Sequence, residues 1–209
     1  MEKVSVIGAG TMGAGIAQIA ATKGHQVYLY DSSNTAIEDA KSKLNKILNR
    51  LIEKERISKE KKKDILENIQ FTTDLKDIND SNIVIEAIIE DLETKQKVFT
   101  SIEEIVDESC IIASNTSSLS IASIAGACNR PERILGIHFF NPAPIMPLVE
   151  IIPAVQTTKN TLNTAKGGIL NTIESAKRAL SKNQTVDHML LLKPLTTMKY
   201  RKFFCCGKC

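Results

Sequence analysis

The chain contains 209 residues, 43% hydrophobic and 24% charged, with a formal net charge of +3 at pH 7, which is the composition of an ordinary soluble globular protein. No apolar run approaches the roughly 20 residues needed to span a bilayer. Because the sequence starts directly with an apolar strand, we expect neither a signal peptide nor a transit peptide. We therefore expect a cytoplasmic protein that binds neither membranes nor nucleic acid.

The first predicted element is a strand over Val4–Ile7 that runs into the glycines of a G-x-G-x-x-G pattern. Gly8 allows a tight turn, Gly10 leaves room for a pyrophosphate near the backbone, and Gly13 lets the following helix pack on the strand. Free N–H groups and the dipole at the start of that helix favour an anion. A glycine-rich turn without a ligand is the alternative. The cofactor-binding residues predicted for this segment are Gly8, Gly10, Thr11, Met12 and Gly13.

A second strand is predicted over Val27–Tyr30, and it ends in Asp31. An acidic residue at this point, roughly 20 residues after the glycines, holds the ribose hydroxyls of NAD. We expect NAD as the cofactor and NADH in preference to NADPH, because Asp31 would repel a 2′-phosphate; use of NADP is the open alternative. His25 lies in the turn before this strand, where we expect it to be solvated.

A long helix is predicted over residues 37–51, where apolar residues recur at steps of three and four behind cap candidates at residues 32–34. The dense run of charges from Lys54 to Lys63 is expected to continue as a helical hairpin. Two interpretations of this run stay open. It is either a solvated face or a landing place for an anionic group such as the phosphates of coenzyme A.

Further strands are predicted over residues 69–72, 82–87, 111–115, 134–140 and 148–152. The run at 82–87 is suited to a parallel strand buried on both faces. Strands that alternate with helical stretches predict an α/β fold, a Rossmann-type, doubly wound and mostly parallel sheet. Ligands of such sheets bind beyond the carboxyl ends of the strands. The polar residues expected to collect there are Asp31, Glu90, Asn115, Ser117, His138 and Asn141.

The sequence changes character near residue 157. From there on it has ten basic and two acidic residues, a net charge of +8, whereas the first 156 residues have 17 basic and 22 acidic residues, a net charge of −5. We expect a dinucleotide-binding Rossmann domain over residues 1–156 and a short, atypical basic appendage over residues 157–209. Apolar positions from Leu162 to Leu180 suggest a helix that Gly167 and Gly168 weaken.

No metal site is expected from the five cysteines. Cys110 and Cys128 lie in apolar stretches and are interpreted as inert core thiols, which fits a reducing compartment. The other three cysteines lie in the last five positions with only His188 nearby, and this set lacks the further ligands that a zinc site needs.

His138 is the one histidine predicted at the carboxyl end of a strand beside the cofactor cleft. A dehydrogenase needs a base for the hydroxyl proton, and imidazole titrates in the useful range. Glu150, on the next predicted strand, could orient the ring, while Ser117 and Asn141 could hydrogen-bond a substrate oxygen. The alternative is that both residues are structural. His138 would then be a hydrogen-bonded histidine at the edge of the sheet, and Glu150 an acidic residue on the surface.

Four motifs together resemble the 3-hydroxyacyl-CoA dehydrogenase family, and within it the bacterial 3-hydroxybutyryl-CoA dehydrogenases of butyrate and butanol metabolism. The resemblance covers about residues 1–152, and the motif centred on His138 is highly specific. The motifs are Val6-Ile-Gly-Ala-Gly-Thr-Met-Gly13, Val84-Ile-Glu-Ala87, Ser114-Asn-Thr-Ser-Ser-Leu119 and Gly136-Ile-His-Phe-Phe-Asn-Pro-Ala-Pro144.

The resemblance implies an oxidoreductase that interconverts (S)-3-hydroxybutyryl-CoA and acetoacetyl-CoA, or longer 3-hydroxyacyl-CoA and 3-oxoacyl-CoA, by hydride transfer with a nicotinamide cofactor. It implies that His138 is the catalytic base, that Glu150 is its partner, and that Ser117 and Asn141 contact substrate. The nucleotide contacts that it implies are Asp31, Glu90, Lys95 and Asn115.

The resemblance stops where the family continues into a helical domain that carries the dimer interface and part of the acyl-CoA cleft. The basic segment from residue 157 stands in its place, so the family's homodimer interface is expected to be largely absent. Two alternatives therefore stay open beside the enzyme. One is a nucleotide-binding fragment or a crystallin-like relative without turnover, and the other is a different Rossmann dehydrogenase that uses a lysine base.

Overall fold

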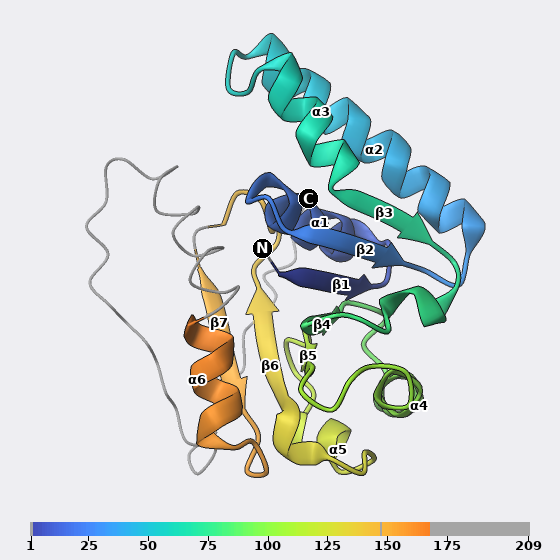
Figure 1. The fold of residues 1–209 in the computed structure, drawn as a ribbon, viewed down its shortest axis with the longest axis vertical. Coiled ribbons are helices and arrows are strands. Elements are labelled where there is room, and N and C mark those ends of the chain that lie inside the picture. The colour runs from blue at the N-terminus through green and yellow to red at the C-terminus, as the bar shows by residue number, and fades with distance from the viewer. Residues whose placement is uncertain (1, 147, 168–209) are drawn as a thin grey trace, which may run out of the picture.

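The computed structural model describes residues 2–146 and 148–167. They form a seven-stranded sheet in the order β3-β2-β1-β4-β5-β6-β7 (Figure 1). The first six strands are parallel, and β7 pairs antiparallel with β6 at one edge. This doubly wound sheet confirms the predicted fold class. The strands are β1 (Lys3–Ile7), β2 (Gln26–Tyr30), β3 (Ile69–Thr72), β4 (Ile83–Glu86), β5 (Ile111–Ser114), β6 (Ile134–Phe139) and β7 (Val149–Pro153).

Helices cover both faces of the sheet (Figure 1). One layer packs α1 against both helices of a hairpin, and the other packs α4 against α5. The helices are α1 (Thr11–Thr22), α2 (Asn34–Glu53), α3 (Lys59–Glu67), α4 (Leu92–Glu103), α5 (Ile121–Ala125) and α6 (Lys159–Gly167), with 3₁₀ turns η1 (Leu75–Ile78) and η2 (Pro131–Arg133).

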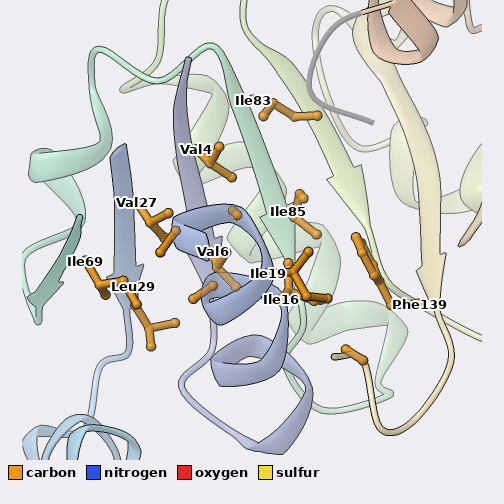
Figure 2. Packing of buried hydrophobic residues seen from close by; sticks show 14 of the residues in the cluster. Val4, Val6, Ile16, Ile19, Val27, Leu29, Ile69, Ile83, Ile85 and Phe139 are labelled. Atoms are coloured by element: carbon orange, nitrogen blue, oxygen red, sulfur yellow. The ribbon is translucent and has the colours of Figure 1, made fainter. Parts of the chain in front are cut away.

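The core consists of two apolar clusters, one on each face of the sheet. Along β4, Ile83 and Ile85 belong to the cluster under α1, whereas Val84 belongs to the cluster under α4 and α5. Figure 2 shows Ile16 and Ile19 of α1 packed over the strands of the first cluster. Alternate side chains of a strand point to opposite faces, so β4 is buried on both sides, as its apolar run predicts.

Local signals explain the helix boundaries. Ser33 caps α2, with its Oγ accepting a hydrogen bond from the Ala36 N–H at 3.3 Å. The predicted helical hairpin is present as α2 and α3. Helix α5 was not predicted, because its five residues are too short for a periodic pattern; Ser120 caps it by accepting from the Ser123 N–H.

The prediction for His25 is wrong, because the side chain is buried rather than solvated. Only 5% of the residue is exposed, and its Nε2 has no hydrogen-bond partner among the described residues. Burial lowers the pKa of this imidazole below its ordinary value of 6.5. A turn between a helix and a strand is exposed on average, but here Glu2 at the start of the chain lies against it and donates its N–H to Nδ1 at 3.4 Å.

Helix α6 follows β7 and packs back on the sheet domain. Thr161 Oγ donates to the Glu132 carbonyl at 2.9 Å, and Ala165 is 2% exposed within the first apolar cluster. Residues 157–167 of the predicted appendage therefore contact the domain. The remainder of the predicted helix, His188 and the last three cysteines lie outside the described residues. No helix in the described part of the chain has the length and apolar character to cross a membrane.

Candidate active site

The glycine loop between β1 and α1 is built by close backbone contacts. Gly8 has a φ of 103°, and its N–H donates to the Tyr30 carbonyl at 2.7 Å. A Cβ on Gly13 would lie 1.8 Å from the Gly8 carbonyl oxygen, so only glycine fits there. A Cβ on Gly10 would meet nothing within 4 Å. The first and third glycines thus shape the loop, whereas the second keeps the space above it open.

Asp31 ties the end of β2 to this loop. Its Oδ2 accepts from the Ala9 N–H at 2.8 Å and its Oδ1 from the Ser33 N–H at 2.9 Å. The carboxylate therefore lies beside the glycine loop with lone pairs left for further donors. At the start of α1, Thr11 is exposed and Met12 is half-buried.

A cavity of about 330 Å³ opens at the carboxyl ends of the central strands. Seven predicted site residues, which are far apart in the sequence, line it together. Apolar residues complete the wall. The lining residues are Met12, Ala87, Ile88, Glu90, Lys95, Asn115, Ser117, His138, Phe139, Phe140 and Asn141.

His138 and Glu150 face each other across the β6–β7 ladder. They are register partners in the antiparallel pair, and His138 Nδ1 lies 2.9 Å from Glu150 Oε2. The His138 side chain is 17% exposed, and its ring centroid lies 4.6 Å from that of Phe140. A neutral imidazole that donates through Nδ1 keeps a lone pair on Nε2. The pair is therefore arranged to accept a proton at the cavity.

Asn115 connects the end of β5 to the histidine strand. Its Oδ1 accepts from the Phe139 N–H at 2.8 Å, which leaves the amide NH₂ free to donate to a ligand. Ser117 and Asn141 are exposed and contribute to the cavity lining. Asn141 precedes a cis peptide bond to Pro142. Polar side chains that follow β5 and β6 thus line one cavity.

Glu90 holds the loop that carries Ser117. Its Oε1 accepts from the Ser117 N–H at 3.1 Å, the Ser118 N–H at 3.2 Å, the Ser118 hydroxyl at 3.0 Å and the Thr116 hydroxyl. Partial burial by itself raises the pKa of the Glu90 carboxyl, but the hydrogen bonds from Thr116 and Ser118 and the charge of Lys95 outweigh it, so the pKa is lowered. Glu90 is therefore held as a carboxylate.

Residues 3–178 match the family model of the 3-hydroxyacyl-CoA dehydrogenase NAD binding domain. The chain belongs to this family. It is 43% identical over 162 residues to a 3-hydroxybutyryl-CoA dehydrogenase of Clostridioides difficile, covering 78% of this chain and 58% of the relative. A Mycobacterium tuberculosis 3-hydroxybutyryl-CoA dehydrogenase is 36% identical over 183 residues, covering 87% and 62%. The chain thus spans about three fifths of the length of these relatives.

A solved structure agrees with this assignment. The (S)-3-hydroxybutyryl-CoA dehydrogenase of Ralstonia eutropha superposes with a TM-score of 0.80 at 39% identity, covering 83% of this chain and 61% of that one. The family resemblance seen in the motifs is thereby confirmed.

The NAD cofactor of the 3-hydroxyacyl-CoA dehydrogenase family fits the glycine loop of this chain. Gly10 is the N-cap of α1 and forms no side-chain cap, and the first turn of the helix contains no acidic residue. The first N–H groups of α1 are therefore available to a pyrophosphate. In the described part of the chain, no three His, Cys, Asp or Glu side chains gather in a way that could hold a metal ion.

Glu86, the last residue of β4, is a buried carboxylate for which the sequence predicted no role. The residue is 0% exposed and lies 2.5 Å from Lys95 Nζ. Its signal in the sequence is an acidic residue that ends a wholly apolar strand, because a buried carboxylate requires a partner. The apolar cavity residues Ala87, Ile88 and Phe140 give no comparable signal, since their types are common in any core.

Cys110 and Cys128 lie on the far side of the sheet from α1, in or against the second apolar cluster. Burial raises the pKa of the Cys110 thiol to about 12 and that of Cys128 to about 11. Thiols at such values are almost fully protonated at neutral pH and react slowly. The prediction that these two are inert core thiols is consistent with this burial.

Proposed function

We propose that this chain is the cofactor-binding part of an enzyme that interconverts (S)-3-hydroxybutyryl-CoA and acetoacetyl-CoA in butyrate or fatty-acid metabolism. The observation that carries the proposal is the His138–Glu150 pair at 2.9 Å, on a cavity that also receives the cofactor-loop residue Met12. A proton acceptor next to a dinucleotide site is what alcohol oxidation requires.

The proposed roles follow the geometry of the cavity. The bound nicotinamide supplies or accepts the hydride. Nε2 of His138 takes the hydroxyl proton during oxidation and returns it during reduction, while Glu150 keeps the proton on Nδ1 and stabilises the charged ring. Ser117 and Asn141 donate to the substrate oxygen, whose negative charge changes during transfer.

The cofactor contacts are proposed on the same basis. Asp31 accepts from the ribose hydroxyls, and the first turn of α1 from Thr11 binds the pyrophosphate. Asn115 donates its free NH₂ group to the nucleotide. Glu90 and Lys95, which lie 3.4 Å apart on the cavity wall, complete the cofactor site.

Residues 1–156 are proposed as the domain that performs these functions, with an acyl-CoA as the small-molecule partner. The homodimer that the family resemblance implies is proposed for forms that include the remaining two fifths of the relatives' length. In the charged α2–α3 hairpin, Lys41 contacts Glu38 and Lys62 contacts Asn49.

A binding protein without turnover is the second candidate, since Asp31 beside the glycine loop and the free helix start of α1 would serve cofactor binding alone. One assay separates the two: NADH oxidation with acetoacetyl-CoA, measured alongside NADH binding. Binding together with substrate-dependent oxidation that His138→Ala abolishes supports the enzyme. Tight NADH binding without any oxidation, in this chain and in a form extended to the relatives' length, would support the binding protein.

A further inference from the structure

Glu86 is unusual because its charged side chain is fully buried. It ends β4 at 0% exposure, and three donors satisfy it: Lys95 Nζ at 2.5 Å, the Ile88 N–H at 2.7 Å and the Ser114 hydroxyl at 2.7 Å. Removing a charge from water costs several kcal/mol, about what its partners must return. The residue thus forms an organised ionic centre behind the cavity wall.

Lys95 links this centre to the cavity. Its side chain is 1% exposed, and its Nζ lies between Glu86 Oε1 and Glu90 Oε2, the latter at 3.4 Å. Glu90 is 38% exposed and uses its other oxygen, Oε1, for the loop of residues 116–118. A continuous series of contacts therefore runs from a buried strand end to the loop that carries Ser117.

We propose that Glu86 is a positioning residue: it fixes the Lys95 ammonium, which in turn keeps Glu90 oriented so that Oε1 holds the 116–118 loop and places Ser117 at the cavity. The catalytic consequence rests on the function proposed above, but the structural link does not. Ser117 itself makes no contact with Glu86, so the effect passes through Lys95 and Glu90.

The charges explain why Glu86 is needed. Two carboxylates, Glu86 and Glu90, share the positive charge of the Lys95 ammonium. Glu90 therefore needs only Oε2 for the ammonium and can use Oε1 for the loop. If the charge of Glu86 is removed, Glu90 becomes the remaining anionic partner of the ammonium among the described residues. The buried ammonium then draws Glu90 toward itself, in competition with the loop donors.

Glu86→Gln tests this link in the 209-residue chain. The amide has the shape of the carboxylate; its oxygen can accept from Lys95 and Ile88, and its NH₂ can donate to Ser114. Amide hydrogen exchange reads out the Ser117 and Ser118 N–H groups directly. We expect their protection to fall about tenfold, the equivalent of one hydrogen bond, while β1 keeps its protection.

Glu103→Gln is the matched control. Glu103 is a second carboxylate with a 7% exposed side chain, and it lies 3.8 Å from Arg133, away from the cavity. Its substitution should lower stability without changing exchange at the loop. Unchanged loop protection in a folded Glu86→Gln chain, or an equal loss in Glu103→Gln, would overturn the proposal.

If Glu86→Gln alone does not fold, the double variant Glu86→Gln with Lys95→Met removes both buried charges together. The groups around Glu90 are then the hydroxyls of Thr116 and Ser118 and the N–H groups of Ser117 and Ser118, without the ammonium. The pKa of Glu90 rises, so loop protection should be lost at a higher pH than in the unsubstituted chain. An unchanged pH midpoint would overturn the proposal. Because these readouts need no turnover, they stay independent of the dehydrogenase assay.

Discussion

At the residue scale, the antiparallel register of β6 and β7 places a base and a carboxylate opposite each other. For a form of the protein with measurable turnover, we expect His138→Ala to lower kcat by about 10²- to 10⁴-fold, the usual contribution of a positioned acid–base group. NADH binding should change little. Glu150→Gln should cost less, because the base remains but loses its 2.9 Å partner. Near-normal turnover of His138→Ala would contradict the assignment.

Asp31 provides a second prediction at this scale, on the choice of cofactor. Its carboxylate lies beside the glycine loop and would repel a 2′-phosphate, and Ser33, which donates its N–H to the carboxylate, supplies no positive charge. We expect a clear preference for NADH over NADPH in fluorescence titrations. Asp31→Ser should weaken that preference. Equal affinity for both cofactors in the unsubstituted chain would show that Asp31 does not select.

The lowered pKa of His25 leads to a prediction of how the free energy of unfolding depends on pH. Because burial lowers its pKa in the folded chain, the unfolded chain binds the proton first as the pH falls through 6.5. This histidine thus stabilises the fold above that pH and loses its contribution below it, by at most about 1.4 kcal/mol per pH unit. Urea unfolding between pH 7 and pH 5 should show a smaller loss of stability for His25→Gln. Parallel pH curves for both chains would argue against this.

At the scale of the element, two glycines of the same loop have different roles: we expect Gly10 to matter for cofactor binding and Gly13 for stability. A Cβ on Gly10 has open space, so Gly10→Ala should leave Tm nearly unchanged and yet weaken NADH binding, because the methyl group meets the pyrophosphate. A Cβ on Gly13 would lie 1.8 Å from a carbonyl oxygen, so Gly13→Ala should lower the free energy of unfolding by about 1–3 kcal/mol or more. Thermal melts with NADH titrations check both. Equal melting points for the two variants would refute the distinction.

The elements that sequence predicted well are those with strong periodic signals. The central strands, the Ser33 cap and the hairpin of α2 and α3 follow from apolar patterning and capping chemistry, which act locally. The predicted strands at 82–87 and 134–140 extend beyond the observed β4 and β6 by only one or two residues at their ends. The short helix α5 was missed because five residues carry no period.

The predicted site depended on topology more than on local pattern. Strand ends could be assigned from the sequence, so His138 and Asn115 were placed at one edge of the sheet. Glu150 was likewise predicted to return to His138 from the next strand. The sequence did not reveal that this strand, β7, runs antiparallel to β6, nor that Glu86 pairs with Lys95. Those contacts join residues whose spacing is set by turns and packing, and they form only in the folded chain.

At the scale of the whole molecule, three of the five exposed large apolar residues in the described part of the chain flank one edge of the sheet. Ile145 is 75% exposed, Leu148 46% and Val155 80%, and all three flank the edge strand β7. Exposed apolar residues beside an edge strand favour association. The relatives continue for a further two fifths of their length. We therefore expect the 209-residue chain to aggregate at high concentration, which static light scattering would detect, and Ile145→Lys with Val155→Lys to reduce it.

The last prediction concerns what the 209-residue chain does alone. The glycine loop, Asp31 and the cavity residues all lie within the sheet domain, so we expect detectable NADH binding, with Gly10→Ala as the control for its site. The cavity of about 330 Å³ lies at the lower end of ligand-site volumes, roughly 300–1,000 Å³, and is too small to enclose both a nicotinamide and an acyl-CoA arm. Hydride transfer requires the reacting carbons to be held in near-attack geometry. We therefore expect weak or absent oxidation of NADH by acetoacetyl-CoA in this chain, rising when it is extended to the length of its relatives. Turnover at the level of the full-length relatives, by a soluble dimer of these 209 residues, would show that the chain already contains the complete acyl-CoA site.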